Sequence, residues 1–122
     1  MTELEKMHQK FAVAFNAGDL NGLLALYAPD AVLVPQPGQV ARGQAEIRGA
    51  LQQFLAAKPV IEIKTTAAVE TGNGLALTNG QFVMKGTGAD GKPFEMASKT
   101  AEVLQKQRDG NWLYVIDNPF AS

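Results

Sequence analysis

The chain has 122 residues, the length of one domain large enough to bury a hydrophobic core. Its formal net charge is -1, and lysine and arginine are scattered instead of forming a basic run, so we expect no nucleic-acid partner. The absence of cysteine excludes disulfides, thiolate metal sites and a cysteine nucleophile.

The first six residues, Met-Thr-Glu-Leu-Glu-Lys, carry charge where a signal peptide needs an apolar core. No apolar run approaches the ~20 residues of a membrane span. We therefore expect a cytoplasmic protein with no membrane partner. Without a repeat or a Pro/Ser-rich linker, residues 1–122 are expected to form a single domain.

Three helices are predicted in the first half of the chain. Thr2 and Glu5 form a T-x-x-E capping box that opens the first helix, which Gly18 ends. Asp19 caps a second, shorter helix, and a third follows Gly43. The apolar residues that recur at helical spacing are Leu4, Met7, Phe11 and Phe15, then Leu20, Leu23, Leu24 and Tyr27, then Ile47, Leu51, Phe54 and Leu55.

Strands are predicted mainly in the second half. Residues 31–34 and 40–42 suit short strands, and residues 60–71 form a β-branched strand. Three long antiparallel strands then fill Gly74 to Pro119. Helices grouped early and strands grouped late indicate an α+β fold, with the helices packed on one side of a curved antiparallel sheet.

Two Asp-Gly dipeptides, Asp90-Gly91 and Asp109-Gly110, set the expected register of the long strands. Two-residue turns at these dipeptides place Asn79, Glu102 and Asp117 side by side on one face, and a four-residue second loop closed by Gln107 and Trp112 gives the same register. The same register pairs Gln81 with Thr100, and Leu104 with Val115.

The two faces of this meander differ in their expected roles. The face with the polar row is expected under the helices, and its residues are Leu77, Asn79, Gln81, Val83, Met96, Ser98, Thr100, Glu102, Leu104, Leu113, Val115 and Asp117. The opposite face is apolar and aromatic, and its residues are Thr78, Gly80, Phe82, Met84, Ala97, Lys99, Ala101, Val103, Trp112, Tyr114 and Ile116. Because apolar patches of this size mark interfaces, we expect a homodimer through the outer sheet face.

A polar row under the helices indicates a cavity, because polar groups are costly to bury unless they bond one another or meet a ligand. Two adjacent carboxyls there would not both ionise easily, so one would have a raised pKa and could serve as an acid or base. We therefore expect Asp117 and Glu102 to be catalytic. The residues expected to bind a small hydrophobic ligand are Asn79, Gln81, Thr100, Tyr27, Phe11, Phe15, Phe54 and Val115.

Other candidates are weaker. His8 lies one position off the first helical stripe, so we expect it on a solvated flank. A single histidine offers no metal constellation, and no metal or other cofactor is expected.

Several segments together resemble one known family. The run Phe15-Asn16-Ala17-Gly18-Asp19, the segment Leu23 to Val32, Arg42-Gly43 before Ile47-Arg48, and Asp109-Gly110-Asn111-Trp112 resemble nuclear-transport-factor-2-like domains. The similarity is greatest to the SnoaL-like group and the calcium/calmodulin-kinase association-domain group. It implies a cone-shaped sheet on three helices, a pocket at the open end, and frequent dimerisation across the sheet.

The resemblance to ketosteroid isomerases within this family can be compared residue by residue. The position matching their catalytic Asp holds Pro35, and that matching their oxyanion-hole Tyr holds Phe11. Glu102 retains an acid where they have a protonated Asp. Steroid isomerisation is therefore not expected, whereas the SnoaL-like cyclases, with an acid/base Asp on a pocket strand, point to Asp117.

Two functions stay open. The first is a small-molecule-binding domain, with cofactor-free acid/base chemistry on a hydrophobic carbonyl compound by isomerisation, cyclisation, dehydration or hydration. The alternative is a non-catalytic ligand-binding or dimeric assembly module. A cone filled by its own side chains, with Glu102 in a salt bridge, would favour the alternative.

Overall fold

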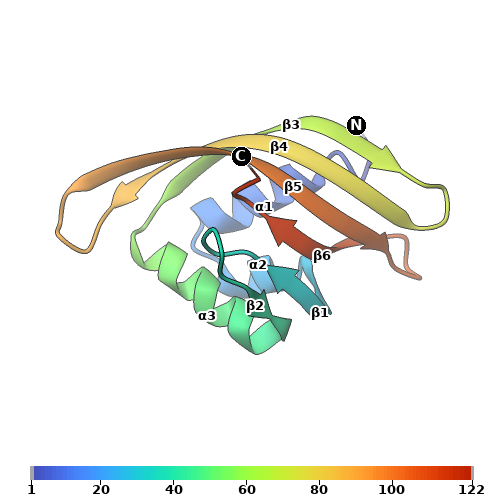
Figure 1. Cartoon of the computed structure of the whole chain (residues 1–122), viewed down its shortest axis with the longest axis horizontal. Coiled ribbons are helices and arrows are strands. Elements are labelled where there is room, and N and C mark those ends of the chain that lie inside the picture. The colour runs from blue at the N-terminus through green and yellow to red at the C-terminus, as the bar shows by residue number, and fades with distance from the viewer. Residues whose placement is uncertain (1, 122) are drawn as a thin grey trace.

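The computed structural model describes residues 2–121, in which a curved six-stranded sheet arches over three helices (Figure 1). The helices are α1 (Met7–Asn16), α2 (Leu20–Leu24) and α3 (Gly43–Ala56). The strands are β1 (Tyr27–Leu33), β2 (Ala41–Arg42), β3 (Val60–Glu70), β4 (Leu75–Thr87), β5 (Pro93–Lys106) and β6 (Trp112–Asn118). The predicted α+β class, curved sheet and three N-terminal helices are confirmed.

The strand order is β2-β1-β6-β5-β4-β3, so β1 and β6, the first and last strands in chain order, are neighbours in the sheet. All neighbouring pairs are antiparallel except β1 and β6, which are parallel. The sheet was expected to be antiparallel, and this pair is the exception. The parallel pairing places Tyr27, at the start of β1, beside Tyr114 on β6.

The turn between α1 and α2 explains the motif at residues 15–19. Phe15 is buried in the core, and Asn16 bonds both backbone groups of Ile61 on β3, accepting from its N–H at 2.7 Å and donating to its C=O at 3.0 Å. Gly18 has a φ of 67°, a conformation that glycine adopts without steric cost. Asp19 caps α2 by accepting a hydrogen bond from the Gly22 N–H at 2.9 Å. The motif thus fixes α1 against β3 and redirects the chain.

Tyr27 was expected at the end of the second helix, and this was wrong. The helix α2 ends at Leu24, and Tyr27 begins β1. The Tyr114 N–H on β6 donates to the Leu26 C=O at 2.8 Å, so the parallel pairing with β6 begins at this point. That pairing gives the backbone an alternative to further helical turns.

The hairpin between β4 and β5 has a three-residue loop, Ala89-Asp90-Gly91, instead of the predicted two-residue turn. The Gly88 N–H closes it by donating to the Lys92 C=O at 2.8 Å, and Gly91 has a φ of 76°. This is the common loop in which a turn is followed by a left-handed glycine. The shift of one residue makes Thr78 face Glu102, whereas Asn79 faces Ala101.

The second hairpin has the same kind of loop, but a bulge corrects its register. The Gln107 N–H donates to the Asn111 C=O at 2.7 Å, and Gly110 has a φ of 86°. Leu104 therefore pairs with Tyr114 and not with Val115 as expected. The register then shifts between this pair and the next, so Glu102 faces Asp117 as predicted. The bulge brings both Tyr114 and Asp117 to the buried side of the sheet.

The predicted register of β4 is off by one residue, so its two faces are exchanged relative to the prediction. Successive side chains of a strand point to opposite faces. The helix-covered face of β4 carries Ala76, Thr78, Gly80, Phe82 and Met84. The outer face carries Leu75, Leu77, Asn79, Gln81 and Val83. Trp112 and Tyr114, expected on the outer face, are also buried in the core.

Candidate functional site

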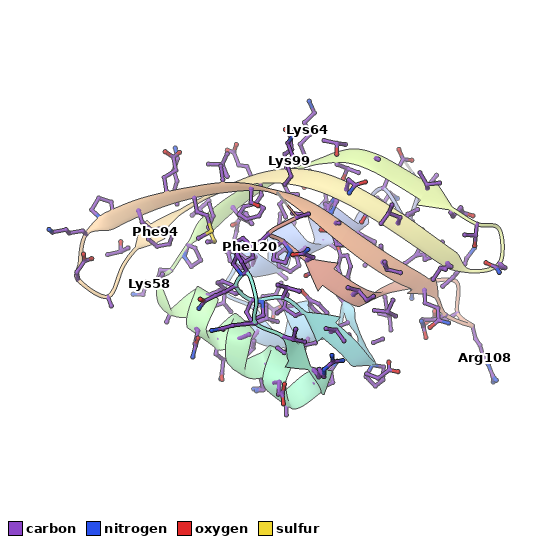
Figure 2. The ribbon with its side chains drawn as sticks, viewed as in Figure 1. Lys58, Lys64, Phe94, Lys99, Arg108 and Phe120 are labelled. Carbon is purple, nitrogen blue, oxygen red and sulfur yellow. The ribbon has the colours of Figure 1, made fainter. Side chains whose placement is uncertain are left out.

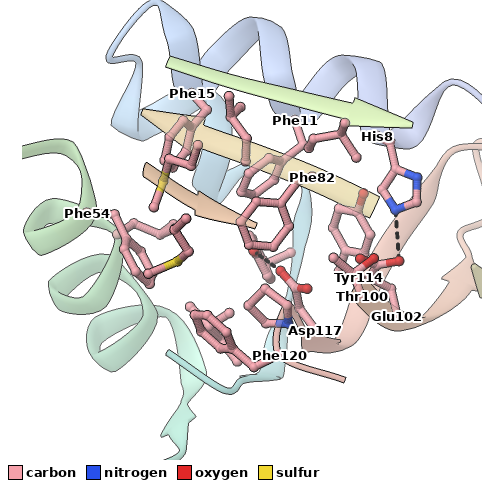
Figure 3. Close-up of a pocket in the computed structure, with 18 residues that line it drawn as sticks. His8, Phe11, Phe15, Phe54, Phe82, Thr100, Glu102, Tyr114, Asp117 and Phe120 are labelled. Atoms are coloured by element: carbon pink, nitrogen blue, oxygen red, sulfur yellow. Dashed lines mark hydrogen bonds and ion pairs between the residues drawn. The ribbon is translucent and has the colours of Figure 1, made fainter. Parts of the chain in front are cut away.

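A cavity of about 60 Å³ lies between the sheet, α1 and α3 (Figure 3). Its walls are mainly aromatic and aliphatic, and five phenylalanines contribute to them: Phe11, Phe15, Phe54, Phe82 and Phe120. The lining residues Phe54, Met96 and Phe120 are half-buried, so the cavity reaches the surface beside them. At the other end the lining side chains are buried and polar.

Glu102 and His8 form a buried pair at the polar end. The His8 Nε2 lies 2.8 Å from Glu102 Oε1, and the Thr78 hydroxyl donates to the same oxygen at 2.7 Å. The other ring nitrogen of His8, Nδ1, lies 2.7 Å from the Thr65 hydroxyl. Every polar atom of the imidazole thus has a partner, and His8 is only 4% exposed.

The expectation that His8 lies on a solvated flank was wrong. His8 is four residues after Leu4 and four before Ala12, and both of these are buried on the inner side of the N-terminal segment. Residues four apart share one face of a helix. This spacing was the signal in the sequence that could have placed His8 inside.

Asp117 faces Glu102 from the adjacent strand, and Tyr27 is its partner. The Tyr27 hydroxyl donates to Asp117 Oδ2 at 2.5 Å, and both side chains are buried. The Tyr27 and Tyr114 rings are tilted against each other with centroids 5.5 Å apart. Tyr114 therefore belongs to the site, although the expected register had placed it on the outer face.

The environment shifts the pKa of Asp117 into the neutral range. Burial raises the pKa of this carboxyl from 3.8 to about 7, and the nearby charge of Glu102 adds to the rise. The hydrogen bond from Tyr27 and the charge of His8 act in the opposite direction. Burial, and then the charge of Asp117, raise the pKa of Tyr27 well above 10, so this phenol stays a hydrogen-bond donor. A carboxyl with a pKa near 7 can take up or release a proton at neutral pH.

Thr100 lies on the cavity wall, two residues before Glu102 on β5. Its side chain is buried, and its Oγ1 has no hydrogen-bond partner within residues 2–121. Buried hydroxyls in proteins usually have a partner. Thr100 is therefore an unused polar group at the closed end of the cavity.

Of the eight predicted ligand-binding residues, five line the cavity: Tyr27, Phe11, Phe15, Phe54 and Thr100. Asn79 and Gln81 do not, because the register of β4 turns them to the outer face, where Asn79 donates to the Thr100 C=O at 3.1 Å. Val115 is the extra residue of the β6 bulge and does not contribute to the lining either. The predicted row of Asn79, Glu102 and Asp117 is thus wrong in its first member, whose place is taken by Thr78.

The outer face of the sheet carries an apolar row. Val69, Leu77, Val103 and Ile116 are consecutive cross-strand neighbours on β3, β4, β5 and β6. Leu77 and Ile116 are 43% and 46% exposed, although both are large and apolar. Lys64 and Lys99 rise from the same face beside Gln81, farther along the strands (Figure 2).

Within residues 2–121, no group of three or more His, Asp or Glu side chains could hold a metal ion. No helix in this part of the chain is long and apolar enough to cross a membrane.

A family model described as the SnoaL-like domain matches residues 8–115, and the chain belongs to this family. A search of curated proteins finds no significant match. Solved structures with similar folds are numerous.

Three of these solved structures illustrate the fold. A candidate calcium/calmodulin dependent protein kinase II association domain from Xanthomonas campestris has a TM-score of 0.81 at 24% identity, over 98% of this chain and 87% of the other. A ketosteroid isomerase-like protein from Erwinia carotovora atroseptica has a TM-score of 0.83 at 22% identity, over 94% of this chain and 90% of the other. An uncharacterised protein with a cystatin-like fold from Caulobacter vibrioides has a TM-score of 0.81 at 20% identity, over 97% of this chain and 86% of the other. At these identities the likeness establishes the shared fold alone.

Proposed function

We propose that this SnoaL-like domain binds a small hydrophobic carbonyl compound and moves a proton on it by cofactor-free acid/base chemistry. One observation carries the proposal: Asp117 and Glu102 face each other across neighbouring strands at the buried end of an otherwise apolar cavity. The pKa of Asp117 there is raised to about 7. Perturbed carboxyls in a cleft are typical of functional sites.

Asp117 is the proposed base. Its Oδ2 accepts the bond from Tyr27, which leaves Oδ1 to take a proton from the carbon next to a carbonyl group. The same proton then returns to carbon or oxygen, so isomerisation, cyclisation or dehydration differ only in where the electron pair goes. The surrounding phenylalanines exclude water and hold the hydrocarbon part of the substrate.

Glu102 has a different proposed role from the one expected from the sequence. A protonated Glu102 was expected to donate to a developing oxyanion. Its Oε1 instead accepts a hydrogen bond from the Thr78 hydroxyl and lies 2.8 Å from His8 Nε2, so this oxygen already has partners within the protein. We propose that Glu102 acts on Asp117, because its negative charge helps to raise the pKa of the base.

The alternative function, a non-catalytic binding or assembly module, is supported by two specific observations. The cavity is small, at about 60 Å³, and Glu102 is paired with His8. Against this, the cavity is not filled by the protein's own side chains. A purely structural core would also have little use for the unpartnered Thr100 hydroxyl and a buried Asp117.

We also propose a homodimer through the outer face of the sheet. The apolar row of Val69, Leu77, Val103 and Ile116 crosses four strands and lies on the face away from the helices. A second copy that places the same row against this one would remove these side chains from water.

The experiment that tests the proposed chemistry is deuterium incorporation into small ketones in D2O, followed by NMR. Abstraction of a proton next to the carbonyl exchanges it for deuterium without requiring the natural product of the reaction. We expect the wild type to accelerate exchange. Asp117→Asn should lower the rate of exchange by about a hundredfold or more, the usual contribution of a general base. Asp30→Asn, an exposed aspartate on β1, is the matched control. An Asp117→Asn variant as active as the wild type would rule out Asp117 as the base.

A further inference from the structure

Thr100 stands out among the polar groups at the closed end of the cavity. Tyr27 is bonded to Asp117, and His8 and Thr78 are bonded to Glu102, whereas Thr100 Oγ1 has no partner within the described residues. Thr100 is 5% exposed, so bulk water does not compensate its hydroxyl. A buried donor without an acceptor is costly, unless a ligand supplies the acceptor.

Gly80 leaves just enough room for this hydroxyl where β4 pairs with β5. Gly80 faces Thr100 across β4 and β5. A Cβ at position 80 would lie 3.1 Å from Thr100 Oγ1 and 3.0 Å from His8 Cε1, closer than nearly all real contacts of this kind. A larger residue at position 80 would crowd the Thr100 hydroxyl. The unpartnered hydroxyl of Thr100 thus lies directly opposite a glycine.

The charges of the lining select a neutral acceptor. No Lys or Arg lines the cavity, and its one histidine, His8, is already bonded to Glu102, so an anionic ligand would meet the carboxyl groups of Glu102 and Asp117 without a free cation. A cation gains little, because both carboxyl groups already have hydrogen-bond donors. A carbonyl oxygen is uncharged and accepts a hydrogen bond without needing to donate one.

The size and shape of the cavity limit the rest of the ligand. One water needs about 10–15 Å³ on this scale, so a cavity of about 60 Å³ suits a ligand with one small ring. Aromatic side chains, among them Phe11, Phe15 and Phe54, surround it and favour a planar body (Figure 3). The half-buried Phe54 and Phe120 mark the open side, so the carbonyl group enters first.

We propose that the Thr100 hydroxyl donates a hydrogen bond to the carbonyl oxygen of a small, planar, uncharged ketone or aldehyde with a single ring. This assignment rests on the proposed function for the existence of a ligand site, and it adds the substrate class and its orientation. The carbonyl oxygen lies at Thr100, and the ring lies among the phenylalanines toward Phe54 and Phe120. Thr100 therefore fixes the substrate before Asp117 acts on it.

The test compares two probes of nearly equal shape, acetophenone and α-methylstyrene, which has a C=CH2 group in place of C=O. Affinities are measured by ligand-observed NMR for the wild type, Thr100→Val, Thr100→Ser and the control Thr66→Val, an exposed threonine on β3. We expect the wild type to prefer acetophenone. Thr100→Val should lose about tenfold in acetophenone affinity, the effect of one neutral hydrogen bond, with α-methylstyrene binding unchanged. Thr100→Ser should stay within about twofold of the wild type.

A second readout separates this role from a structural one. Removal of an unpartnered buried hydroxyl should raise the melting temperature of ligand-free Thr100→Val by about 3 °C, whereas loss of a structural hydrogen bond would lower it. The proposal is overturned if the wild type binds both probes equally, if acetophenone does not bind, or if Thr100→Val weakens both probes alike. Asp117→Asn should still bind acetophenone. Binding retained without any deuterium exchange in the wild type would refute the proposed chemistry and leave the Thr100 assignment standing.

Discussion

Tyr27 and Asp117 join β1 and β6, the first and last strands in chain order, through a hydrogen bond of 2.5 Å, with the tyrosine hydroxyl as donor. Their strands, β1 and β6, are the parallel pair at which the two ends of the fold meet. The bond ends on the carboxyl whose pKa is raised to about 7. The contact between β1 and β6 and the pKa of the cavity carboxyl therefore depend on the same pair of side chains.

Tyr27→Phe should raise the pKa of Asp117 above about 7, because the hydrogen bond from Tyr27 is one of the two influences that lower it. It should also reduce the free energy of unfolding at pH 8 by about 1.5–3 kcal/mol, the range for a hydrogen bond to a charged group. The measurements are a ¹³C NMR titration of the Asp117 carboxyl and urea unfolding. Tyr114→Phe is the control, because it removes a buried phenol that makes no hydrogen bond to Asp117 within the described residues. Equal effects of both variants would contradict the assigned role of Tyr27.

Asp117 should make the folded protein less stable as the pH rises. The pKa of its carboxyl is about 7 in the folded state and 3.8 in the unfolded state, so between these values the folded state binds the extra proton. The contribution of this group is fully present below pH 3.8 and is lost as the pH rises through 7, for a total on the order of 4 kcal/mol.

Asp117→Asn does not titrate, so its stability relative to the wild type should increase between pH 4.5 and pH 8. Urea unfolding at several pH values measures this difference, with Asp30→Asn as the exposed control. A difference that stays constant with pH would show that the Asp117 pKa is not raised.

His8→Ala should destabilise the protein by about 1–3 kcal/mol at pH 7, because it leaves Glu102 Oε1 and the Thr65 hydroxyl without a buried hydrogen-bond partner. It should also raise the pKa of Asp117, which the charge of His8 lowers. Urea unfolding and the Asp117 titration measure the two effects. Gln9→Ala, at the exposed neighbouring position on α1, should change neither. A His8→Ala variant as stable as Gln9→Ala would exclude a buried His8–Glu102 pair.

Leu77→Lys should weaken the proposed homodimer by placing a charge in the middle of the outer apolar row. Light scattering coupled to size-exclusion chromatography should detect a shift from dimer to monomer, with the far-UV circular dichroism spectrum unchanged. Val13→Lys, on α1, is the control, since Val13 is also exposed but lies away from this row. A wild type that is monomeric at every concentration, or a Leu77→Lys protein that remains dimeric, would refute this interface.

The sequence predicted the elements of this fold well because their signals are local. The Asp19 cap, the two Asp-Gly loops and the helical spacing around Ile47 and Leu51 each act within a few residues, and the structure has them where expected. The facing pair of Glu102 and Asp117 was also predicted.

The register of β4 was harder to predict, because it depends on the length of the loop to β5. Two-residue and three-residue loops are both common, and they give registers that differ by one residue. The choice of a three-residue loop at Gly91 moved Asn79 and Gln81 out of the site and Thr78 into it. The pair of Glu102 and Asp117 survived because the bulge at Val115 offset the corresponding error in the second hairpin. Such a bulge is a tertiary feature with no strong local signal.

The parallel contact between β1 and β6 was likewise beyond local patterns, since it joins segments about ninety residues apart. It determines that Tyr27 meets Asp117 and that Tyr114 lines the cavity. The chemistry of the candidate site therefore depends on long-range packing, although both carboxyl groups were identifiable from the sequence.

The pH dependence of deuterium exchange into acetophenone tests whether Asp117 is a base whose pKa is raised partly by Glu102. The exchange rate of the wild type should rise with pH and reach half its maximum near pH 7, as Asp117 loses its proton. In Glu102→Gln the midpoint should move to lower pH, because the negative charge that opposes ionisation of Asp117 is gone. A profile without a midpoint near 7, or one that Glu102→Gln leaves unmoved, would refute the proposed roles of Asp117 and Glu102.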